Sequence, residues 1–311
     1  MTDPDHRYLI VGGTTKAAST SLYFYLSAHR DICAASMKEP RFFLSVDYPV
    51  PSSHRLERDG FARYLSFYEH CPEASLRMEA TPDYLHSRPT PAWIAEHLPR
   101  AGALFVLREP ISRLVSWYRF AREDGRVGDD VSFRAFVDAQ VTDDEIRDAP
   151  QHLRVLRQGR YADDLERWLE KLGPGRVLTV FFEDLVSDAR PVLDTICRFA
   201  GLESDRFEDL DLSVHNPTRG TRFAWMHRAY KKARYLIRQR THDRPALQRS
   251  LRWLRLRLEP VYWWLNASDR PEARVPDDLR EDLVDYYRDS VARLGSLVDA
   301  PLPAAWRDEY L

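Results

Sequence analysis

The sequence has little cysteine: only Cys33, Cys71 and Cys197 occur among its 311 residues, and they lie far apart. Their odd number and wide spacing predict neither a disulfide framework nor a metal-binding cluster. The chain also lacks any run of about 18 uncharged apolar residues, so we expect no membrane-spanning helix. Its first residues, MTDPDHRYLI, lack a basic region followed by an apolar stretch, which argues against a secretory signal. These absences predict a cytoplasmic protein.

The chain has no excess of charge of one sign either. Its 46 lysines and arginines nearly balance 48 acidic residues, so the composition does not indicate nucleic-acid binding. Residues 219–258 differ, with 13 basic residues and one acidic residue. Three interpretations of residues 225–265 remain: a lid over an anionic or lipid-linked acceptor, a helix at a membrane surface, or a solvated basic face. The tryptophans that favour the membrane surface are Trp225, Trp253, Trp263 and Trp264.

Short apolar runs alternate with helix-forming segments along most of the chain. Unbroken apolar runs such as ALFVL are typical of parallel strands that are covered on both faces. The alternation therefore predicts an α/β fold, a parallel β-sheet flanked by helices, with a helical basic C-terminal region. The expected strands are Tyr8–Val11, Ile32–Ala35, Leu76–Ala80, Ala103–Leu107 and Val177–Phe182.

The length is compatible with one domain covering residues 1–311. Within it we expect a core at 7–215, a basic helical region at 216–275 and a closing helix at 277–297. Further helices are expected at 60–68, 91–98, 111–122, 131–141, 161–171 and 190–200, and a surface loop at 44–60.

The first strand leads into a helix through a loop of small residues, in the stretch YLIVGGTTKAASTSLYFYL at 8–26. Gly12 and Gly13 end the strand, and Ser19–Ser21 can begin the helix. The N–H groups and the dipole at a helix start attract phosphate, and Lys16 adds a positive charge. The loop lacks the Gly-Lys-Ser/Thr of nucleotide-triphosphatase P-loops. A plain Gly-Gly turn with a solvated lysine is the alternative.

A second candidate phosphate site follows the expected strand at 103–107. Arg108 stands at the carboxyl end of that strand, where open α/β sheets bind ligands. Ser116 follows eight residues later, about two turns into the next helix. These two side chains could hold a second phosphate. Alternatively, Arg108 pairs with Glu109 or a helix end, and Ser116 only lets helices approach closely.

Together the two motifs resemble those of sulfotransferases that use 3′-phosphoadenosine 5′-phosphosulfate (PAPS). The resemblance covers roughly residues 8–225 and the last helix, and it implies a P-loop-like sheet. It also implies that Arg108 and Ser116 bind the 3′-phosphate. In the loop, Ala18 stands where the family often has Gly, so we expect its φ to be negative. The loop residues implied in donor binding are Lys16, Ala17, Ala18, Ser19, Thr20 and Ser21.

The segment KEPRFF at 38–43 resembles the Glu-x-x-Phe-Phe segment of heparan-type and related bacterial carbohydrate sulfotransferases. The resemblance implies that Glu39 is the general base. Such a group is needed because a hydroxyl is a weak nucleophile at neutral pH. An ordinary loop carboxylate is the alternative. The small-molecule branch of the family uses a histidine instead, and we expect His29, the nearest one, to lie at the surface.

Further residues are implied in binding by the same resemblance. Arg219 and Arg222 would contact the 3′-phosphate, or belong to the solvated basic face. The stretch from Glu79 to Tyr84 would line the acceptor site. Alternatively, Thr81-Pro82 has only a structural role as a turn. The residues implied in acceptor binding are Lys38, Glu79, Tyr84 and Tyr161.

The sequence thus predicts a PAPS-dependent sulfotransferase of carbohydrate type. Glu39 would act as base, and Lys16 would neutralise charge on the breaking bridge oxygen. The acceptor would be a small molecule or glycan with a hydroxyl, or less favourably an amine, and no metal is expected. The location would be cytoplasmic, with contact to the inner membrane face as a further interpretation. A P-loop-type small-molecule kinase and a non-catalytic phosphate- or lipid-binding protein are the alternatives.

Overall fold

The computed structural model describes residues 2–71, 75–141, 149–207, 212, 220–221, 267–268 and 275–311. The chain forms two compact units. The first contains Met1–Leu114, Gln140–Asn216 and Asp277–Leu311, and the second contains Val115–Ala139 and Pro217–Pro276. Our expectation of one domain over 1–311 stays a prediction.

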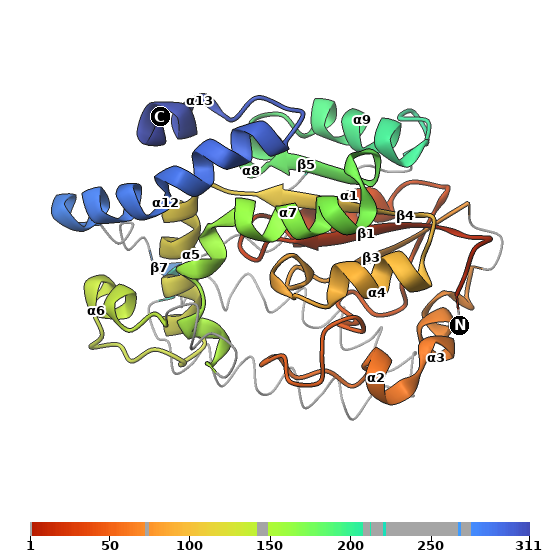
Figure 1. Cartoon of the computed structure of the whole chain (residues 1–311), viewed down its shortest axis with the longest axis horizontal. Helices are drawn as coiled ribbons and strands as arrows, with labels where there is room; N and C mark the ends of the chain where they lie inside the picture. Colours follow the sequence, from red (N-terminus) through yellow and green to blue (C-terminus); the bar gives the residue numbers. More distant parts are fainter. Residues whose placement is uncertain are drawn as a thin grey trace. The chain divides into compact units, whose positions relative to one another are not determined.

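A five-stranded parallel sheet forms the centre of the first unit, in the order β2-β3-β1-β4-β5 (Figure 1). Each expected strand is present within one or two residues of its expected ends, which confirms the α/β fold class. The strands are β1 (Arg7–Gly13), β2 (Ile32–Ala34), β3 (Leu76–Ala80), β4 (Ala101–Leu107) and β5 (Val177–Phe181).

Helices cover both faces of this sheet because alternate strand residues point to opposite sides. Leu9 and Val11 of β1 belong to a buried cluster with residues of α1 (Ser19–Ser27) and α9 (Ala189–Ala200). On the other face, the ring of Phe105 lies 4.9 Å from that of Trp168 in α7 (Tyr161–Leu172). The apolar runs therefore supply two layers of core from one set of strands.

The other helices and turns of the first unit mostly confirm the expected pattern. Three α-helices are additional: α2 lies in the stretch expected to be a loop, α8 follows β5, and α13 follows the closing helix. The elements are α2 (Leu56–Asp59), α3 (Phe61–Leu65), η1 (Ser66–Tyr68), η2 (Tyr84–His86), α4 (Thr90–His97), η3 (Gln151–Leu153), η4 (Arg157–Gly159), η5 (Pro174–Arg176), α8 (Phe182–Ser187), α12 (Asp277–Leu297) and α13 (Ala304–Tyr310).

Helix α5 (Pro110–Glu123) begins in the first unit and continues into the second. The second unit also has α6 (Phe133–Asp138) and a short antiparallel pair, β6 (Gly220–Thr221) with β7 (Ala267–Ser268). Ser132 caps α6 by accepting the N–H of Ala135. Nearly all of the basic region at 216–275 lies outside the described residues.

The expectations for the cysteines and for His29 are wrong. Cys33 of β2 and Cys71, just after η1, form a disulfide with their Cα atoms 6.1 Å apart. Their separation of 38 residues gave no sign of this, because only the fold brings β2 and η1 together. His29 is buried rather than exposed, with Nε2 2.8 Å from the carbonyl oxygen of Glu203.

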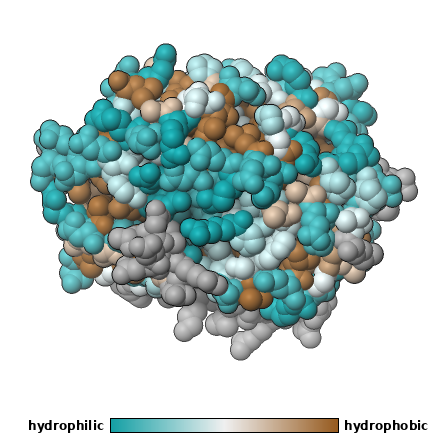
Figure 2. All heavy atoms as spheres, viewed as in Figure 1, coloured by the Kyte–Doolittle hydropathy of each residue, from teal (hydrophilic) through white to brown (hydrophobic). Residues whose placement is uncertain are grey.

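Among the described helices, none combines the length and the apolar character that crossing a bilayer requires. On the face drawn in Figure 2, hydrophilic side chains predominate and apolar ones gather in separate patches.

Candidate active site

The loop between β1 and α1 is built on close backbone packing. A Cβ added to Gly13 would lie 2.7 Å from the Cβ of Leu85, so only glycine fits there. Helix α1 then begins at Ser19 without a side-chain cap, because Ala18 occupies the N-cap position. As at every α-helix start, the first N–H groups point away from the helix, and with its dipole this end attracts anions.

Ala18 has φ 59° and ψ 21°, in the left-handed region, so our expectation of a negative φ is wrong. Lys16 also has a positive φ, 69°. Left-handed conformations are unfavourable for residues with a Cβ, and they are found where the surrounding structure enforces them. The surrounding contacts therefore hold Ala18 in a conformation that glycine adopts more readily.

Two arginines hold this loop by its carbonyl groups. Nη1 of Arg108 donates to the Lys16 carbonyl at 3.2 Å, and Nε of Arg113 donates to the Thr15 carbonyl at 3.2 Å. Arg113 is fully buried, and its Nη1 also donates to the carbonyl of Val155 at 3.1 Å. The structure thus brings Arg108, predicted from sequence, into contact with the predicted phosphate loop.

A buried histidine that sequence reasoning missed also contacts the loop. His86 Nε2 lies 2.9 Å from Oγ1 of Thr14, and its Nδ1 lies 2.6 Å from Oδ2 of Asp164 in α7. Burial lowers the pKa of His86 to about 4, although Asp164 opposes this. Burial raises the pKa of Asp164, but hydrogen bonding with His86 and nearby arginines outweigh it and lower that pKa to about 2. A neutral His86 therefore donates from Nδ1 and accepts the Thr14 hydroxyl at Nε2.

Arg108 and Tyr161 meet where β4 ends. The Tyr161 hydroxyl donates to the carbonyl of Arg108 at 2.7 Å, and the Arg108 guanidinium lies 4.5 Å from the ring centre of Phe182. Tyr161 is thus a buried support for the strand end, and its predicted contact with the acceptor stays a prediction. Ser116 is buried on α5 in the second unit, and its predicted part in donor binding also stays a prediction.

Glu39 lies between two cations. Lys38 Nζ is 2.8 Å from Oε1 of Glu39, and Arg41 Nη2 is 2.9 Å from Oε2. Burial raises the pKa of Glu39, but the charges and hydrogen bonds of Lys38 and Arg41 outweigh it, so the pKa is lowered. Lys38 Nζ also donates to Oγ1 of Thr20 at 3.1 Å. One lysine therefore connects the candidate base with helix α1 of the phosphate loop.

Glu79 and Tyr84 lie fully buried behind this segment. The Tyr84 hydroxyl donates to Oε1 of Glu79 at 3.1 Å and accepts the backbone N–H of Phe43 at 3.1 Å. Burial raises the pKa of Glu79 to about 7, against the effect of its hydrogen bonds. Their predicted contact with the acceptor stays a prediction. Arg219, Arg222 and the segment 225–265 lie outside the described residues.

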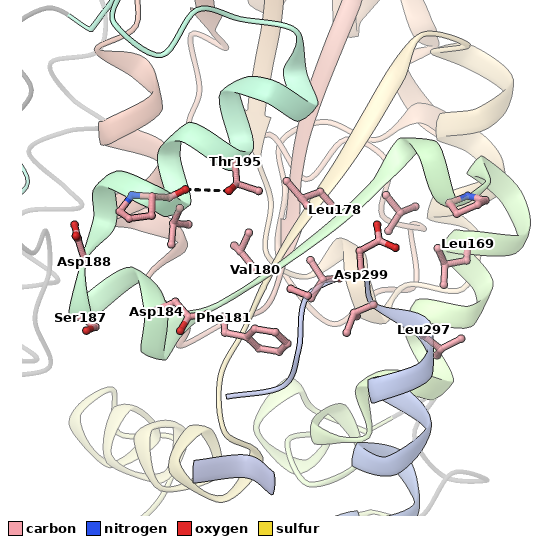
Figure 3. Close-up of a pocket in the computed structure, with 17 residues that line it drawn as sticks. Leu169, Leu178, Val180, Phe181, Asp184, Ser187, Asp188, Thr195, Leu297 and Asp299 are labelled. Carbon is pink, nitrogen blue, oxygen red and sulfur yellow. Dashed lines mark hydrogen bonds between the residues drawn. The ribbon is translucent and has the colours of Figure 1, made fainter. Parts of the chain in front are cut away.

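A large cavity in the described residues lies away from all of these groups. It has a volume of about 620 Å³ and runs along β5, between α9 and the end of α12 (Figure 3). Figure 3 shows Leu178 and Val180 of β5 and Leu297 of α12 beside it. None of the predicted site residues lines it.

One group among the described residues has metal-ligating atoms close together, namely Cys33, His70 and Cys71. The two sulfur atoms are bonded to each other, so neither is a thiolate ligand in this structure. Sulfur and imidazole ligands also do not suit the Mg²⁺ that a kinase would need.

The fold and these contacts define an α/β domain in which one lysine connects an ion-paired carboxylate, Glu39, with the helix that follows the first loop. Residues 6–248 match the family model of the sulfotransferase domain, which is more than half of the chain. The chain therefore belongs to the sulfotransferase family, and this confirms the family predicted from the motifs at Lys16, Glu39 and Arg108.

Curated relatives match a similar part of the chain. Human bifunctional heparan sulfate N-deacetylase/N-sulfotransferase 3 is 28% identical over 207 residues, covering 63% of this chain and 22% of the relative. The Bos taurus protein 2 of the same name is 29% identical over 200 residues, with the same coverage. The chain thus spans about a fifth of the length of these relatives.

A solved sulfotransferase from Alicyclobacillus acidocaldarius resembles the whole chain. Its TM-score is 0.68 at 22% identity, covering 97% of this chain and 99% of that one. At this identity the likeness shows the fold.

Proposed function

We propose that this chain transfers a sulfuryl group from PAPS to a hydroxyl or amine of a carbohydrate acceptor. The observation that carries the proposal is the position of Lys38, whose Nζ is 3.1 Å from Thr20 and 2.8 Å from Glu39. A transferase needs its base next to the group being transferred. The lysine connects the two parts of such a site.

The residues of the donor side fit an anion with several phosphate-like groups. Lys16 and Arg108 supply positive charge, and the start of α1 supplies N–H groups without helical partners. PAPS would supply the activated sulfuryl group. Lys16 would stabilise the negative charge that develops on the leaving oxygen. The further donor contacts, from Ser116, Arg219 and Arg222, belong to the same proposal.

On the acceptor side Glu39 is the candidate base. Its lowered pKa keeps the carboxylate ionised at neutral pH, so it can accept the proton of the acceptor hydroxyl or amine. The same ion pairs weaken its basicity, and an incoming acceptor that displaces Lys38 or Arg41 would restore it. The two cations would also attract an anionic glycan.

The acceptor class is inferred from the relatives. The names of the human and bovine proteins include heparan sulfate and N-sulfotransferase, so a polysaccharide with hydroxyl and amine groups is the first acceptor to try. Desulfated heparan sulfate with free amines, compared with its N-acetylated form, would separate transfer to nitrogen from transfer to oxygen.

A cytoplasmic location belongs to the same proposal, with residues 225–265 touching the inner membrane face. The Cys33–Cys71 disulfide argues against it, because disulfides persist mainly in oxidising compartments. Counting thiols in the denatured chain, taken directly from its native compartment, tests this. Three free thiols would support the cytoplasm, and a single one, Cys197, would contradict it.

Calorimetric titration with 3′-phosphoadenosine 5′-phosphate, the spent donor, against ATP–Mg²⁺ tests the donor. We expect binding of the first, weaker binding of the second, and a loss of about 10-fold or more in Arg108→Ala. The exposed Arg190→Ala on α9 is a control that should bind normally. Preference for ATP–Mg²⁺ would indicate a kinase, and donor binding without any turnover would indicate a non-catalytic binding protein.

A further inference from the structure

The carboxylate of Glu79 is the centre of a buried set of hydroxyl groups. Glu79 lies on β3 with no exposed surface. Its Oε1 accepts the hydroxyls of Tyr64 and Tyr84, each at 3.1 Å, and its Oε2 accepts the hydroxyl of Thr81 at 2.8 Å. Three donors thus satisfy a carboxylate that reaches neither solvent nor a basic partner in these contacts.

Two of these three hydroxyls also accept hydrogen bonds from the segment that carries Glu39. Oγ1 of Thr81 accepts the backbone N–H of Arg41 at 3.2 Å, and the Tyr84 hydroxyl accepts that of Phe43 at 3.1 Å. The two N–H groups stand on either side of Phe42, so the segment is held at two points by one carboxylate. Both bridges are short enough to be well-formed hydrogen bonds.

The segment needs such support because its backbone is strained. Arg41 has a φ of 54°, which a residue with a Cβ adopts only when its surroundings enforce it. The same arginine donates from Nη2 to Oε2 of Glu39. The backbone position of Arg41 therefore decides where its guanidinium meets the candidate base.

We propose that Glu79 is a positioning residue: through Thr81 and Tyr84 it fixes the N–H groups of Arg41 and Phe43, and so places the carboxylate of Glu39. This inference rests on the proposed function of Glu39 as the base. It differs from direct contact of Glu79 or Tyr84 with the acceptor, because their burial leaves them behind the segment that they hold.

The donor contacts do not pass through this set of hydrogen bonds. Arg108 donates a hydrogen bond to the carbonyl of Lys16, and neither residue is among the described contacts of Glu79. Loss of a bridge should therefore reduce kcat without weakening binding of 3′-phosphoadenosine 5′-phosphate. A general loss of folding would reduce both.

The test compares Thr81→Val and Tyr84→Phe, each of which removes one bridge, with Tyr68→Phe as the matched control. The Tyr68 hydroxyl is buried in the same aromatic cluster, but it bonds to Tyr64 at 3.2 Å rather than to the carboxylate. Three quantities are measured in the full chain. They are hydrogen exchange of the amides at 41 and 43, turnover with PAPS and desulfated, N-deacetylated heparan sulfate, and calorimetric affinity for 3′-phosphoadenosine 5′-phosphate.

We expect both bridge variants to exchange these amides faster and to lose about 5- to 10-fold in kcat, with unchanged calorimetric affinity for the spent donor. Tyr68→Phe should match the wild type in all three measurements. Unchanged exchange, unchanged kcat, or an equal loss in Tyr68→Phe would each overturn the inference.

Failure of the proposed function is recognised separately. If Glu39→Gln retains full turnover, Glu39 is not the base, and the link from Glu79 to catalysis fails with it. Faster exchange in the bridge variants would then describe only how the segment is held. Because exchange requires no acceptor, it is measured independently of turnover.

Discussion

The loops on the two sides of the candidate site are held in different ways. The phosphate loop is fixed by arginines that donate to its carbonyl groups at Thr15 and Lys16. The segment that carries Glu39 is held through both kinds of backbone group. Hydroxyls accept the N–H groups of Arg41 and Phe43, while Arg55 Nη1 and the Thr90 hydroxyl donate to the carbonyls of the same two residues, each at 2.6 Å. A loop that is to bind an anion is better anchored through its carbonyls, because this leaves its N–H groups for the ligand. A loop that presents a side chain can use both.

The two loops also share one feature, backbone strain. Lys16 and Ala18 on the donor side and Arg41 on the acceptor side all have positive φ. Strain of this kind persists only where surrounding contacts enforce it, and it gathers at functional sites. In both loops the enforcing contacts are buried polar groups, with Arg113 and His86 on one side and Glu79 on the other.

The largest expected effect is a loss of turnover in Glu39→Gln without a loss of donor binding. Glu39→Gln should reduce turnover by roughly 100-fold or more, because the amide cannot accept the acceptor's proton. Binding of the spent donor should remain, since it depends on the other loop. Sulfate incorporation and calorimetry measure the two effects. Asp47→Asn, which changes an exposed carboxylate just beyond the segment, is the control that should retain both. If Glu39→Gln retains turnover, Glu39 is not the base, and the segment that carries it has no demonstrated part in catalysis.

The second effect is a pH dependence of stability that comes from Glu79, the residue that anchors the segment carrying Glu39. The pKa of Glu79 rises from 4.5 to about 7 on folding, so the folded chain holds a proton that the unfolded chain releases between these values. Stability from this group therefore falls as pH rises from 4.5 to about 7, by about 3 kcal/mol in total. Glu79→Gln cannot ionise and should lack this fall. Urea unfolding of both proteins across the window measures the difference, and parallel curves would contradict it.

The third effect concerns the anchor of the donor side. Thr14→Val and His86→Phe each break the hydrogen bond between Thr14 and His86, and each should destabilise the chain by about 1–3 kcal/mol. His86→Phe also removes the bond to Asp164, but both variants lose the bond between Thr14 and His86, so the double variant should lose less than the sum of the two. Urea unfolding of the two single variants and the double variant measures this coupling. Calorimetry should show weaker binding of the spent donor in all three variants. Fully additive losses would mean that the bond does not support the loop.

The sequence predicted the sheet and the chemistry of both loops, but not what holds them. β1 and β4 were predictable because their apolar runs are continuous, and Lys16, Arg108 and Glu39 because each lies within a local motif. Their supports come from distant parts of the chain. Thr14 and Asp164 meet only through His86, 72 and 78 residues away respectively. No local pattern marks such a contact.

The same limit explains the other differences. The four residues of α2 are too few to show helical periodicity, so a helix there could not be told from a loop. His29 follows a helix and precedes two charged residues, which indicated a surface position. Its burial depends on the carbonyl of Glu203, 174 residues later.

The smallest effect tests backbone strain in the loop between β1 and α1, by changing two adjacent alanines. Ala18 has φ 59°, so Ala18→Gly relieves an unfavourable conformation and should leave stability unchanged or raise it by up to about 1 kcal/mol, after the entropy of glycine is counted. Ala17, its neighbour, is fully buried in the core cluster and is not among the residues with positive φ. Ala17→Gly should therefore lower stability by about 1 kcal/mol. Thermal unfolding of both variants gives the sign, and two losses of equal size would contradict the left-handed geometry at Ala18.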